Sequence, residues 1–362
     1  MPWSRWCAGV AGCGLLVALA LPARAQEPVR LPAKPPPEPK LEMKAVLDEL
    51  AAQRARPLET LSPAEARREP TPADAVKALL ERRGQSTAPE AVGKREERSI
   101  EGAAGPLPAR IYWPARGRGP WPVIHYLHGG GWVLADLDTY DASARALANA
   151  AEAIVVASHY RQAPEHPFPA AHEDAFAAYR WILANATSFG GDPSAIAVAG
   201  ESAGGNMAAA IPKMAREAGV LMPVHQVLIY PVAQPGIETP SYRENEDARP
   251  LSAGLMRWCL GHYLRSPEDA TNPLLALLEE DDLEGLPSAT VITAEIDPLR
   301  SEGMLYADRL ERAHVRVNYT NYRGVTHEFF GMGAVLPDAK QAVQQAAADL
   351  RAAFGQARTA RR

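Results

Sequence analysis

The sequence predicts an α/β fold with a mostly parallel central sheet flanked by helices. Two observations predict it. From about residue 96 onward, short apolar runs rich in β-branched residues alternate with stretches of helical periodicity. Parallel strands need crossover connections, and the helices of those connections cover both faces of the sheet. Because active groups in such sheets gather where strands end, residues that follow the apolar runs are the candidates for chemistry.

The strand signals follow one another in a regular order. RSIEG and ARIYWPA predict an antiparallel pair, and six runs follow: WPVIHYL, AIVVASHYR, AIAVAGES, HQVLIYPV, SATVITAEIDPL and VRVNYTNYRG. Helical patterns lie between most of them: YDASARALANAAEA, EDAFAAYRWILANA, AGGNMAAAIPKMAREAG and RSEGMLYADRLERA. Pro212 lies inside the third of these helices, where a proline is expected to kink it.

The N-terminal residues have a different character. Residues 1–25 combine the basic Arg5, a short apolar stretch and a small-x-small site ending at Ala25, which is the layout of a signal peptide. An uncleaved anchor is the alternative. Residues 26–42 are rich in proline and predict an extended linker. We therefore expect an exported chain, periplasmic or secreted, with no stable membrane insertion after the signal is removed.

Residues 43–85, ahead of the first strand, predict helices. Apolar residues between Met43 and Leu50 recur at helical spacing. Ser, Pro and Glu within 62–65 predict a helix start, because the serine and the glutamate can cap each other's backbone. The main domain is then expected to span 43–352, and a basic tail is expected at 353–362.

Composition narrows the function classes. The chain has 38 Lys+Arg against 43 Asp+Glu and a formal net charge of −5, which gives no reason to expect nucleic acid as a partner. Of its three cysteines, only Cys259 would remain after signal removal, so no intrachain disulfide is expected. The sequence has no clustered Cys/His metal set and no Walker-type phosphate loop. We expect neither a metal nor a cofactor.

One serine lies between glycines where a strand pattern ends and a helix pattern begins. Residues 200–204 read GESAG, which fits the G-x-S-x-G pattern of a sharp strand-to-helix turn. Such a turn presents the Ser202 hydroxyl above the sheet in a strained conformation. The alternative is an ordinary glycine-rich connection. The strand before the motif and the helix after it favour a nucleophile.

A serine hydroxyl needs a base, and the base needs an acid that orients it. In this type of fold the order is serine, acid, histidine, which favours His327, after the last strand, among the nine histidines. Asp297 ends a strand run before it and is the expected acid. Glu295 is the other candidate, and an Asp-Pro pair such as Asp297-Pro298 is also typical of a plain helix cap.

A glycine run supplies the third component. His128 is followed by three glycines and Trp132 after a strand pattern. Three glycines can be a plain flexible loop, or they can let bare backbone approach a reacting carbonyl. In the second case the N–H groups of Gly129, Gly130 and Ala203 would hold the developing oxyanion. His128 would then position the loop and would not act as the base.

Five motifs together closely resemble the hormone-sensitive-lipase-like (bacterial family IV) esterases of the α/β-hydrolase superfamily. They are HGGGW at 128–132, YRQAPEHPFPAA at 160–171, GESAGGN at 200–206, DPLRSEG at 297–303 and HEFF at 327–330. Five motifs in the correct order are far more specific than any one of them. The likeness extends from about residue 43 to 352.

The resemblance implies an α/β-hydrolase fold and carboxylic ester hydrolysis. It implies Ser202, Asp297 and His327 as a catalytic triad, and an oxyanion hole from Gly129, Gly130 and Ala203. It also implies a helical cap built from residues 43–85 and 236–270, which would determine specificity. The residues expected to line the substrate pocket are Trp132, Tyr160, Leu255, Met256 and Trp258. The last three are also explained by the buried face of an amphipathic helix.

Two departures from the family pattern lie beside the expected triad. The residue before the serine is commonly Asp in similar proteins and is Glu201 here. The residue after the histidine is commonly Gly and is Glu328 here. A carboxylate at that position would raise the pKa of His327 if the two side chains approach each other.

The expected function is therefore that of a serine ester hydrolase for short-to-medium acyl esters, acting through an acyl-enzyme. The same triad would also serve a deacetylase, lactonase or amidase. A hydrolase-fold binding protein without catalysis is a further alternative, but such proteins typically lack the serine or the histidine. The expected partner is a small-molecule ester, and similar proteins include dimers.

Overall fold

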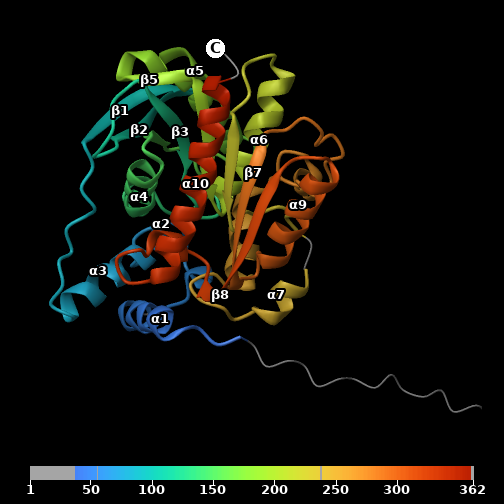
Figure 1. Ribbon diagram of the computed structural model, residues 1–362. Helices are drawn as coiled ribbons and strands as arrows, with labels where there is room; N and C mark the ends of the chain where they lie inside the picture. Colours follow the sequence, from blue (N-terminus) through green and yellow to red (C-terminus); the bar gives the residue numbers. More distant parts are fainter. Residues whose placement is uncertain (1–36, 55, 237–238, 360–362) are drawn as a thin grey trace, which may run out of the picture. The chain divides into compact units, whose positions relative to one another are not determined.

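The computed structural model describes residues 37–54, 56–236 and 239–359 of the 362-residue chain. The predicted signal peptide at 1–25 and most of the predicted linker lie outside these residues. In the described part, eight strands form a sheet in the order β1-β2-β4-β3-β5-β6-β7-β8 (Figure 1). Every predicted strand run is present as a strand. No helix in the described ranges combines the length and apolarity that crossing a membrane requires.

The strands alternate with helices as the sequence predicts. The strands are β1 (Lys94–Gly102), β2 (Gly105–Trp113), β3 (Trp121–Leu127), β4 (Ile154–Ser158), β5 (Gly191–Glu201), β6 (His225–Ile229), β7 (Ser288–Ile296) and β8 (Val317–Thr326). Five helices follow β3, β4, β5, β7 and β8, in that order: α4 (Asp141–Ala151), α5 (Ala170–Asn185), α6 (Ala203–Glu217), α9 (Arg300–Arg312) and α10 (Pro337–Thr359). Short 3-10 turns are η2 (Ala186–Phe189) and η4 (Phe329–Gly331).

The sheet is antiparallel at one edge and parallel elsewhere. β1 and β2 form the predicted antiparallel pair, and β2 continues antiparallel to β4. From β4 across to β8 all neighbouring strands are parallel. β3 lies between β4 and β5. The chain therefore runs from β3 to its neighbour on one side, β4, and then crosses to its neighbour on the other side, β5. The ends of β3 and β5 are therefore a topological switch point, where open α/β sheets place their active groups.

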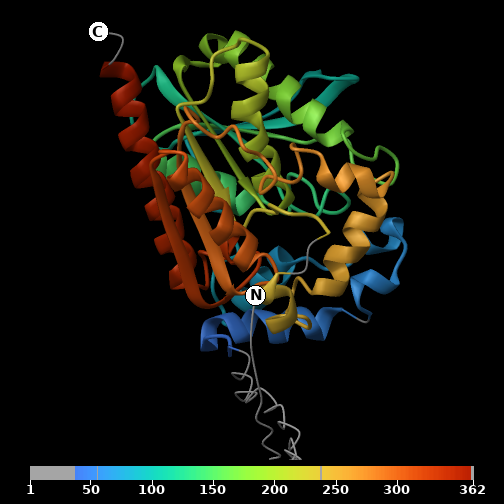
Figure 2. The ribbon, with the colours of Figure 1, turned by 90° about the vertical axis from the view of Figure 1, so that its right-hand side faces the viewer.

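Apolar side chains alternate between two cores, one on each face of the sheet. Along β3, Val123 and Leu127 join the core that α5, α6 and α9 cover, whereas Ile124 and Tyr126 join the core that α4 and α10 cover. Figures 1 and 2 show these helices on opposite sides of the strands. A sheet buried on both faces explains why its strand segments read as continuous apolar runs.

Two further groups of helices complete the molecule. The first comprises α1 (Leu41–Gln53), η1 (Leu58–Thr60), α2 (Pro63–Ala66) and α3 (Pro72–Arg82). The second, between β6 and β7, comprises α7 (Pro240–Glu244), α8 (Ala253–Tyr263) and η3 (Pro267–Thr271). Leu58 and Leu61 of the first group pack in the same core as Leu255 and Met256 of the second. Segments far apart in the chain therefore meet there (Figure 2).

Several element ends differ from the predictions. α2 begins with the predicted capping box, in which Ser62 and Glu65 bond each other's backbone. α1 begins at Leu41, inside the segment predicted as linker. α10 continues past residue 352 to Thr359, because Ala353 and Phe354 are buried, so the predicted tail is helical over its first residues. α6 runs unbroken through Pro212.

Candidate active site

The turn between β5 and α6 holds Ser202 in a conformation that few residues adopt. Its φ is 58° and its ψ −119°, in a region that costs on the order of 1–3 kcal/mol for a residue other than glycine. A Cβ on Gly200 would clash with the backbone of Gly204, and a Cβ on Gly204 would clash with the backbone of Leu127. The two glycines therefore let strand and helix meet closely enough to make this turn.

The glycine loop after β3 lies directly beside this turn. β3 and β5 pair in parallel with Leu127 opposite Gly200, so the two strands end together. A Cβ on Gly129 would lie 3.1 Å from the Cβ of Ser202. Ala203 is the first residue of α6, and its N–H is one of those without an intrahelical acceptor. The three expected oxyanion donors therefore belong to backbone that borders Ser202.

His128 holds the glycine loop and is a poor base. Its Nδ1 is 2.8 Å from the carbonyl oxygen of Gly129, and its Nε2 is 2.9 Å from Nδ1 of His159. A carbonyl oxygen only accepts, so Nδ1 of His128 carries the proton and Nε2 accepts from His159. Burial, with a smaller effect of His159, lowers the pKa of His128 to about 3. The ring is therefore neutral at ordinary pH.

His327 and Asp297 form a buried hydrogen-bonded pair. Nδ1 of His327 donates to Oδ2 of Asp297 at 2.7 Å, and the Asp297 side chain is 0% exposed. The other carboxylate oxygen, Oδ1, accepts from the backbone N–H of Leu299 at 2.8 Å. Asp297 thus braces the turn before α9 and also binds the histidine. The N-cap of α9 is Leu299, without a side-chain hydrogen bond, so Asp297 is not the plain helix cap that the sequence left open as an alternative.

Glu295, the alternative acid, has another partner. Its Oε2 accepts from the backbone N–H of Gly324 at 2.8 Å, at the end of β8. α7 holds the turn of Asp297 from the other side: Asn245 donates to the carbonyl oxygen of Asp297, and Ser241 donates to that of Pro298. These contacts of α7 with the acid-bearing turn were not predicted.

Carboxylates near His327 raise the pKa of its ring. Burial by itself lowers the pKa of the His327 imidazole. The charge of Asp297 and its hydrogen bond act in the opposite direction, as do the carboxylates of Glu328 and Glu201. Their sum raises the pKa of His327 above its ordinary value. An imidazolium at this position is therefore stabilised, which suits a base that must accept a proton.

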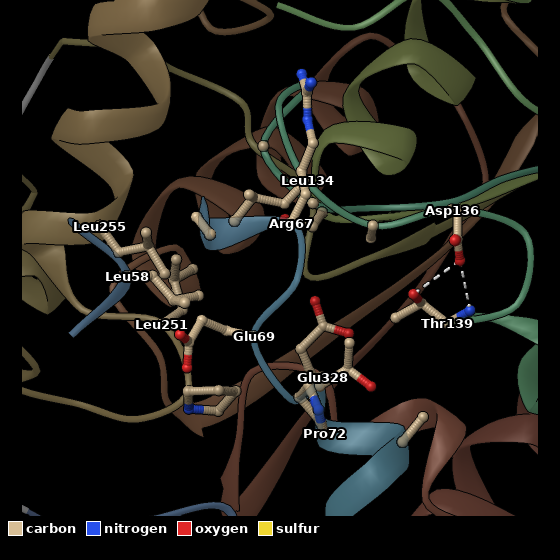
Figure 3. Close-up of a pocket in the computed structure, with 18 of the residues that line it drawn as sticks. Leu58, Arg67, Glu69, Pro72, Leu134, Asp136, Thr139, Leu251, Leu255 and Glu328 are labelled. Carbon is tan, nitrogen blue, oxygen red and sulfur yellow. Dashed lines mark hydrogen bonds between the residues drawn. The ribbon is translucent and has the colours of Figure 1, made fainter. Parts of the chain in front are cut away.

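Ser202 and His327 open into one cavity of about 550 Å³, between the sheet and the two outer helix groups. Figure 3 shows that Leu58, Leu251 and Leu255 form an apolar side, with Asp136 and Thr139 on the other side. The described residues lining the cavity include Gly130, Gly131, Leu134, Met256, Cys259, Glu69, Arg54 and Glu328. The cavity is large enough for a small organic ester and is partly apolar, as ligand sites usually are.

The structure divides the five expected pocket residues. Leu255 and Met256 line the cavity. Trp132, Tyr160 and Trp258 are not among the described residues that line it. Trp132 is fully buried against the ring of Tyr263, with ring centroids 4.5 Å apart.

The other two aromatic side chains support loops. The Tyr160 hydroxyl donates to the carbonyl oxygen of Gly129 at 2.9 Å, and Trp258 Nε1 donates to that of Leu61 at 3.2 Å. A motif or a periodicity places a residue near the site without giving the direction of its side chain, and the structure adds these two hydrogen bonds.

Polar residues that the sequence did not single out also build the site. Arg67 of the N-terminal helix group donates to the carbonyl oxygens of Val133 and Ala163 and binds both oxygens of Glu165. It thereby joins the N-terminal helices to the segment after the glycine loop. His172 shares a hydrogen bond of 2.9 Å with Asn206 in α6. Asn206 belongs to the GESAGGN motif, but nothing local in the sequence distinguishes Arg67 or His172 from ordinary surface or helix residues.

Comparison with known proteins identifies the family. Residues 124–331 match the family model described as alpha/beta hydrolase fold. Carboxylesterase NlhH of Mycobacterium tuberculosis is 43% identical over 251 residues, which cover 68% of this chain and 79% of that protein. Ethyl acetate hydrolase of Pseudomonas putida is 32% identical, over 80% of this chain and 90% of that protein.

Solved structures agree with these relatives. An α/β hydrolase enzyme from the metagenome of Lake Arreo, Spain, has a TM-score of 0.78 and 39% identity, covering 87% of this chain and 98% of that chain. A Pyrobaculum calidifontis esterase has a TM-score of 0.77 and 38% identity, covering 86% and 98%. The fold, the order of the motifs and these relatives lead to one conclusion: the chain belongs to the α/β-hydrolase-fold family, in the group of hormone-sensitive-lipase-like carboxylesterases.

Proposed function

We propose that this protein is a serine carboxylesterase in which Ser202 is the nucleophile, His327 the general base and Asp297 the orienting acid. The observation that carries the proposal is the 2.7 Å hydrogen bond from His327 Nδ1 to Asp297, beside a cavity that Ser202 also lines. That bond fixes the proton on Nδ1 and leaves Nε2 free to accept. The strained turn at Ser202 and the adjoining glycine loop support the same assignment.

The geometry supports an acyl-enzyme mechanism. The Ser202 hydroxyl attacks the ester carbonyl while Nε2 of His327 takes its proton, and Asp297 stabilises the resulting imidazolium. The backbone N–H groups of Gly129, Gly130 and Ala203 hold the oxyanion. His327 then protonates the leaving alcohol. Water repeats the sequence on the acyl-enzyme, releases the acid and restores the serine.

The size of the cavity favours short-to-medium acyl chains. A cavity of about 550 Å³ whose apolar side is made by leucines matches a short alkyl group beside the alcohol. We expect kcat/KM on p-nitrophenyl esters, measured from acetyl to palmitoyl, to be highest between two and about eight carbons. A maximum at palmitoyl, or no hydrolysis along the whole series, would reject this substrate range.

A pair of leucine variants tests whether the cavity sets that preference. Leu255→Ala enlarges the apolar side of the cavity, so its optimum is expected to move toward longer chains. Leu221→Ala removes a leucine that is 47% exposed and does not line the cavity, so the wild-type profile should remain. The same shift in both variants would mean that the preference arises elsewhere.

We also infer that the chain is exported and acts as a soluble enzyme, as a monomer or homodimer without nucleic acid. The signal-peptide layout of residues 1–25 supports export. Expression of the full chain in a Gram-negative host is expected to give periplasmic or extracellular esterase activity and a mature protein that begins just after Ala25. The intact mass of the protein in the active fraction tests this prediction. A full-length mass in the membrane fraction would instead favour an uncleaved N-terminal anchor.

A further inference from the structure

Glu328, which directly follows His327, has an unusual backbone conformation. Its φ is 69°, in the left-handed region that residues other than glycine rarely enter. Its side chain lines the cavity (Figure 3), and Oε1 accepts a hydrogen bond of 2.6 Å from the hydroxyl of Tyr140. Outliers of this kind persist where surrounding contacts impose them, and they concentrate at functional sites.

Tyr140 connects this carboxylate to the glycine loop. It is buried at the start of α4, after the segment that the glycine loop leads into. A Cβ on Gly129 would clash with the Tyr140 hydroxyl, so that hydroxyl lies against the backbone of Gly129. One hydroxyl therefore touches the loop of the expected oxyanion donors and binds the residue after the base. Tyr140 and Glu328, which this hydrogen bond joins, are 188 positions apart in the chain.

Other charged groups face the same space. Asp297 approaches from the turn after β7, Arg54 from the end of α1 and Glu201 from the end of β5. Burial raises the pKa of Glu328 above its ordinary value, and the imidazole of His327 and the hydroxyl of Tyr140, which favour its ionised form, offset only part of that effect.

Glu201 is fully buried. Its two oxygens accept from the hydroxyls of Tyr126 and Tyr230, and the Tyr230 ring lies 4.4 Å from that of His327. Burial, followed by the charge of Glu328, raises the pKa of Glu201 to about 7. Both Glu328 and Glu201 raise the pKa of His327, and Glu328 has the larger effect of the two.

We propose that Glu328 and Tyr140 are a positioning pair: Tyr140 ties the histidine loop to the glycine loop through Glu328, and the carboxylate of Glu328, next to His327, shifts the acid limb of the pH–rate profile to higher pH. The proposal rests on the proposed role of His327 as the base. A carboxylate beside the imidazole favours its protonated form. The free base therefore needs a higher pH, and in exchange the imidazolium that forms during catalysis is stabilised.

The test is the pH dependence of kcat/KM on p-nitrophenyl acetate. Glu328→Gln removes the charge and keeps an oxygen that can accept from Tyr140, so the acid limb is expected to move to lower pH by about one unit. Glu328→Asp keeps the charge and should keep the wild-type limb. Tyr140→Phe keeps the carboxylate but breaks the link between the loops, so it is expected to lower kcat at the pH optimum about fivefold.

A matched control has the same substitution at a remote site. Glu152 also has a positive φ, 50°, but it ends α4 and is exposed. Glu152→Gln should leave the profile unchanged. An acid limb that stays in place in Glu328→Gln, or that moves equally in Glu152→Gln, overturns the role of the charge. A Tyr140→Phe variant with unchanged kcat overturns the link.

These outcomes are distinct from a failure of the proposed function. If the wild type hydrolyses no ester, the assignment of His327 as base fails first. If the wild type is active and Glu328→Gln has the same rate as the wild type at every pH, the triad remains and only the positioning pair is rejected. The thermal unfolding midpoint of each variant is measured as well, to separate a lower rate from a loss of folded protein.

Discussion

Replacement of Ser202 by alanine is expected to lower kcat for ester hydrolysis by about 10⁶-fold, the size of effect seen when a serine hydrolase loses its nucleophile. The variant keeps the cavity, the pair of His327 and Asp297, and the backbone donors beside the turn. It lacks only the oxygen that forms the acyl-enzyme. The residual rate is that of water attack on an ester held by the remaining groups.

The measurement compares kcat on p-nitrophenyl acetate with the thermal unfolding midpoint of the same preparation. We expect the midpoint to stay within a few degrees of the wild type, because no packed atom other than the hydroxyl oxygen is lost. Ser194→Ala is the matched control: it lies near the start of β5, the strand that ends just before Ser202, and its hydroxyl donates to Asp192 at 2.6 Å. Its activity should be retained.

Either of two results would contradict the assignment. A Ser202→Ala variant with more than about a hundredth of wild-type activity would place the nucleophile elsewhere, because loss of a single oxyanion donor already costs 10²–10³-fold. An equal loss of activity in Ser202→Ala and Ser194→Ala would mean that removal of either hydroxyl damages the structure around β5, so the loss could not be assigned to the nucleophile. Labelling with a phosphonate inhibitor separates the two, since only a protein with the nucleophile intact gains its mass.

The parts of this structure that the sequence predicts are those governed by local rules. A parallel sheet buried on both faces needs continuous apolar strands, so the runs could be found one after another. The turn at Ser202 excludes side chains at Gly200 and Gly204, and this requirement is visible as a motif. Asp297 and His327 could be placed because each follows a strand at the same edge of the sheet.

The remaining parts depend on contacts between ordinary residues far apart in the chain. Arg67 holds two carbonyl groups near the glycine loop, and Tyr140 binds Glu328. An arginine at the end of a short helix and a tyrosine at the start of another carry no local mark of these roles. The same reason applies to Trp132, which follows the glycines and packs against Tyr263, a contact that the motif does not reveal.

Conversion of Asp297 to asparagine is expected to lower kcat by about 10⁴-fold, although the new side chain has nearly the same shape. The carboxylate accepts at both oxygens, from His327 Nδ1 and from the N–H of Leu299. An amide accepts at only one. The backbone N–H of Leu299 can only donate. The amide oxygen is therefore expected to face Leu299, and the NH₂ group to face His327.

That orientation disables the base. An NH₂ group donates to Nδ1, so the proton of the neutral ring must move to Nε2, the atom that would have to accept the proton of Ser202. KM should change little, because Asp297 is 0% exposed and does not line the cavity. The test is a kcat and KM determination on one short-chain ester, together with the pH profile, since removal of a carboxylate that raises the pKa of His327 should also move the acid limb to lower pH.

Glu295→Gln is the decisive control, because Glu295 lies two residues earlier and was the competing candidate. Its Oε2 accepts from the N–H of Gly324, and the amide oxygen of glutamine can do the same. We expect its kcat to remain within about tenfold of the wild type, since only the charge on one hydrogen bond is lost. A larger loss in Glu295→Gln than in Asp297→Asn would assign the acid to Glu295, against the geometry in which Asp297 alone of the two contacts the imidazole.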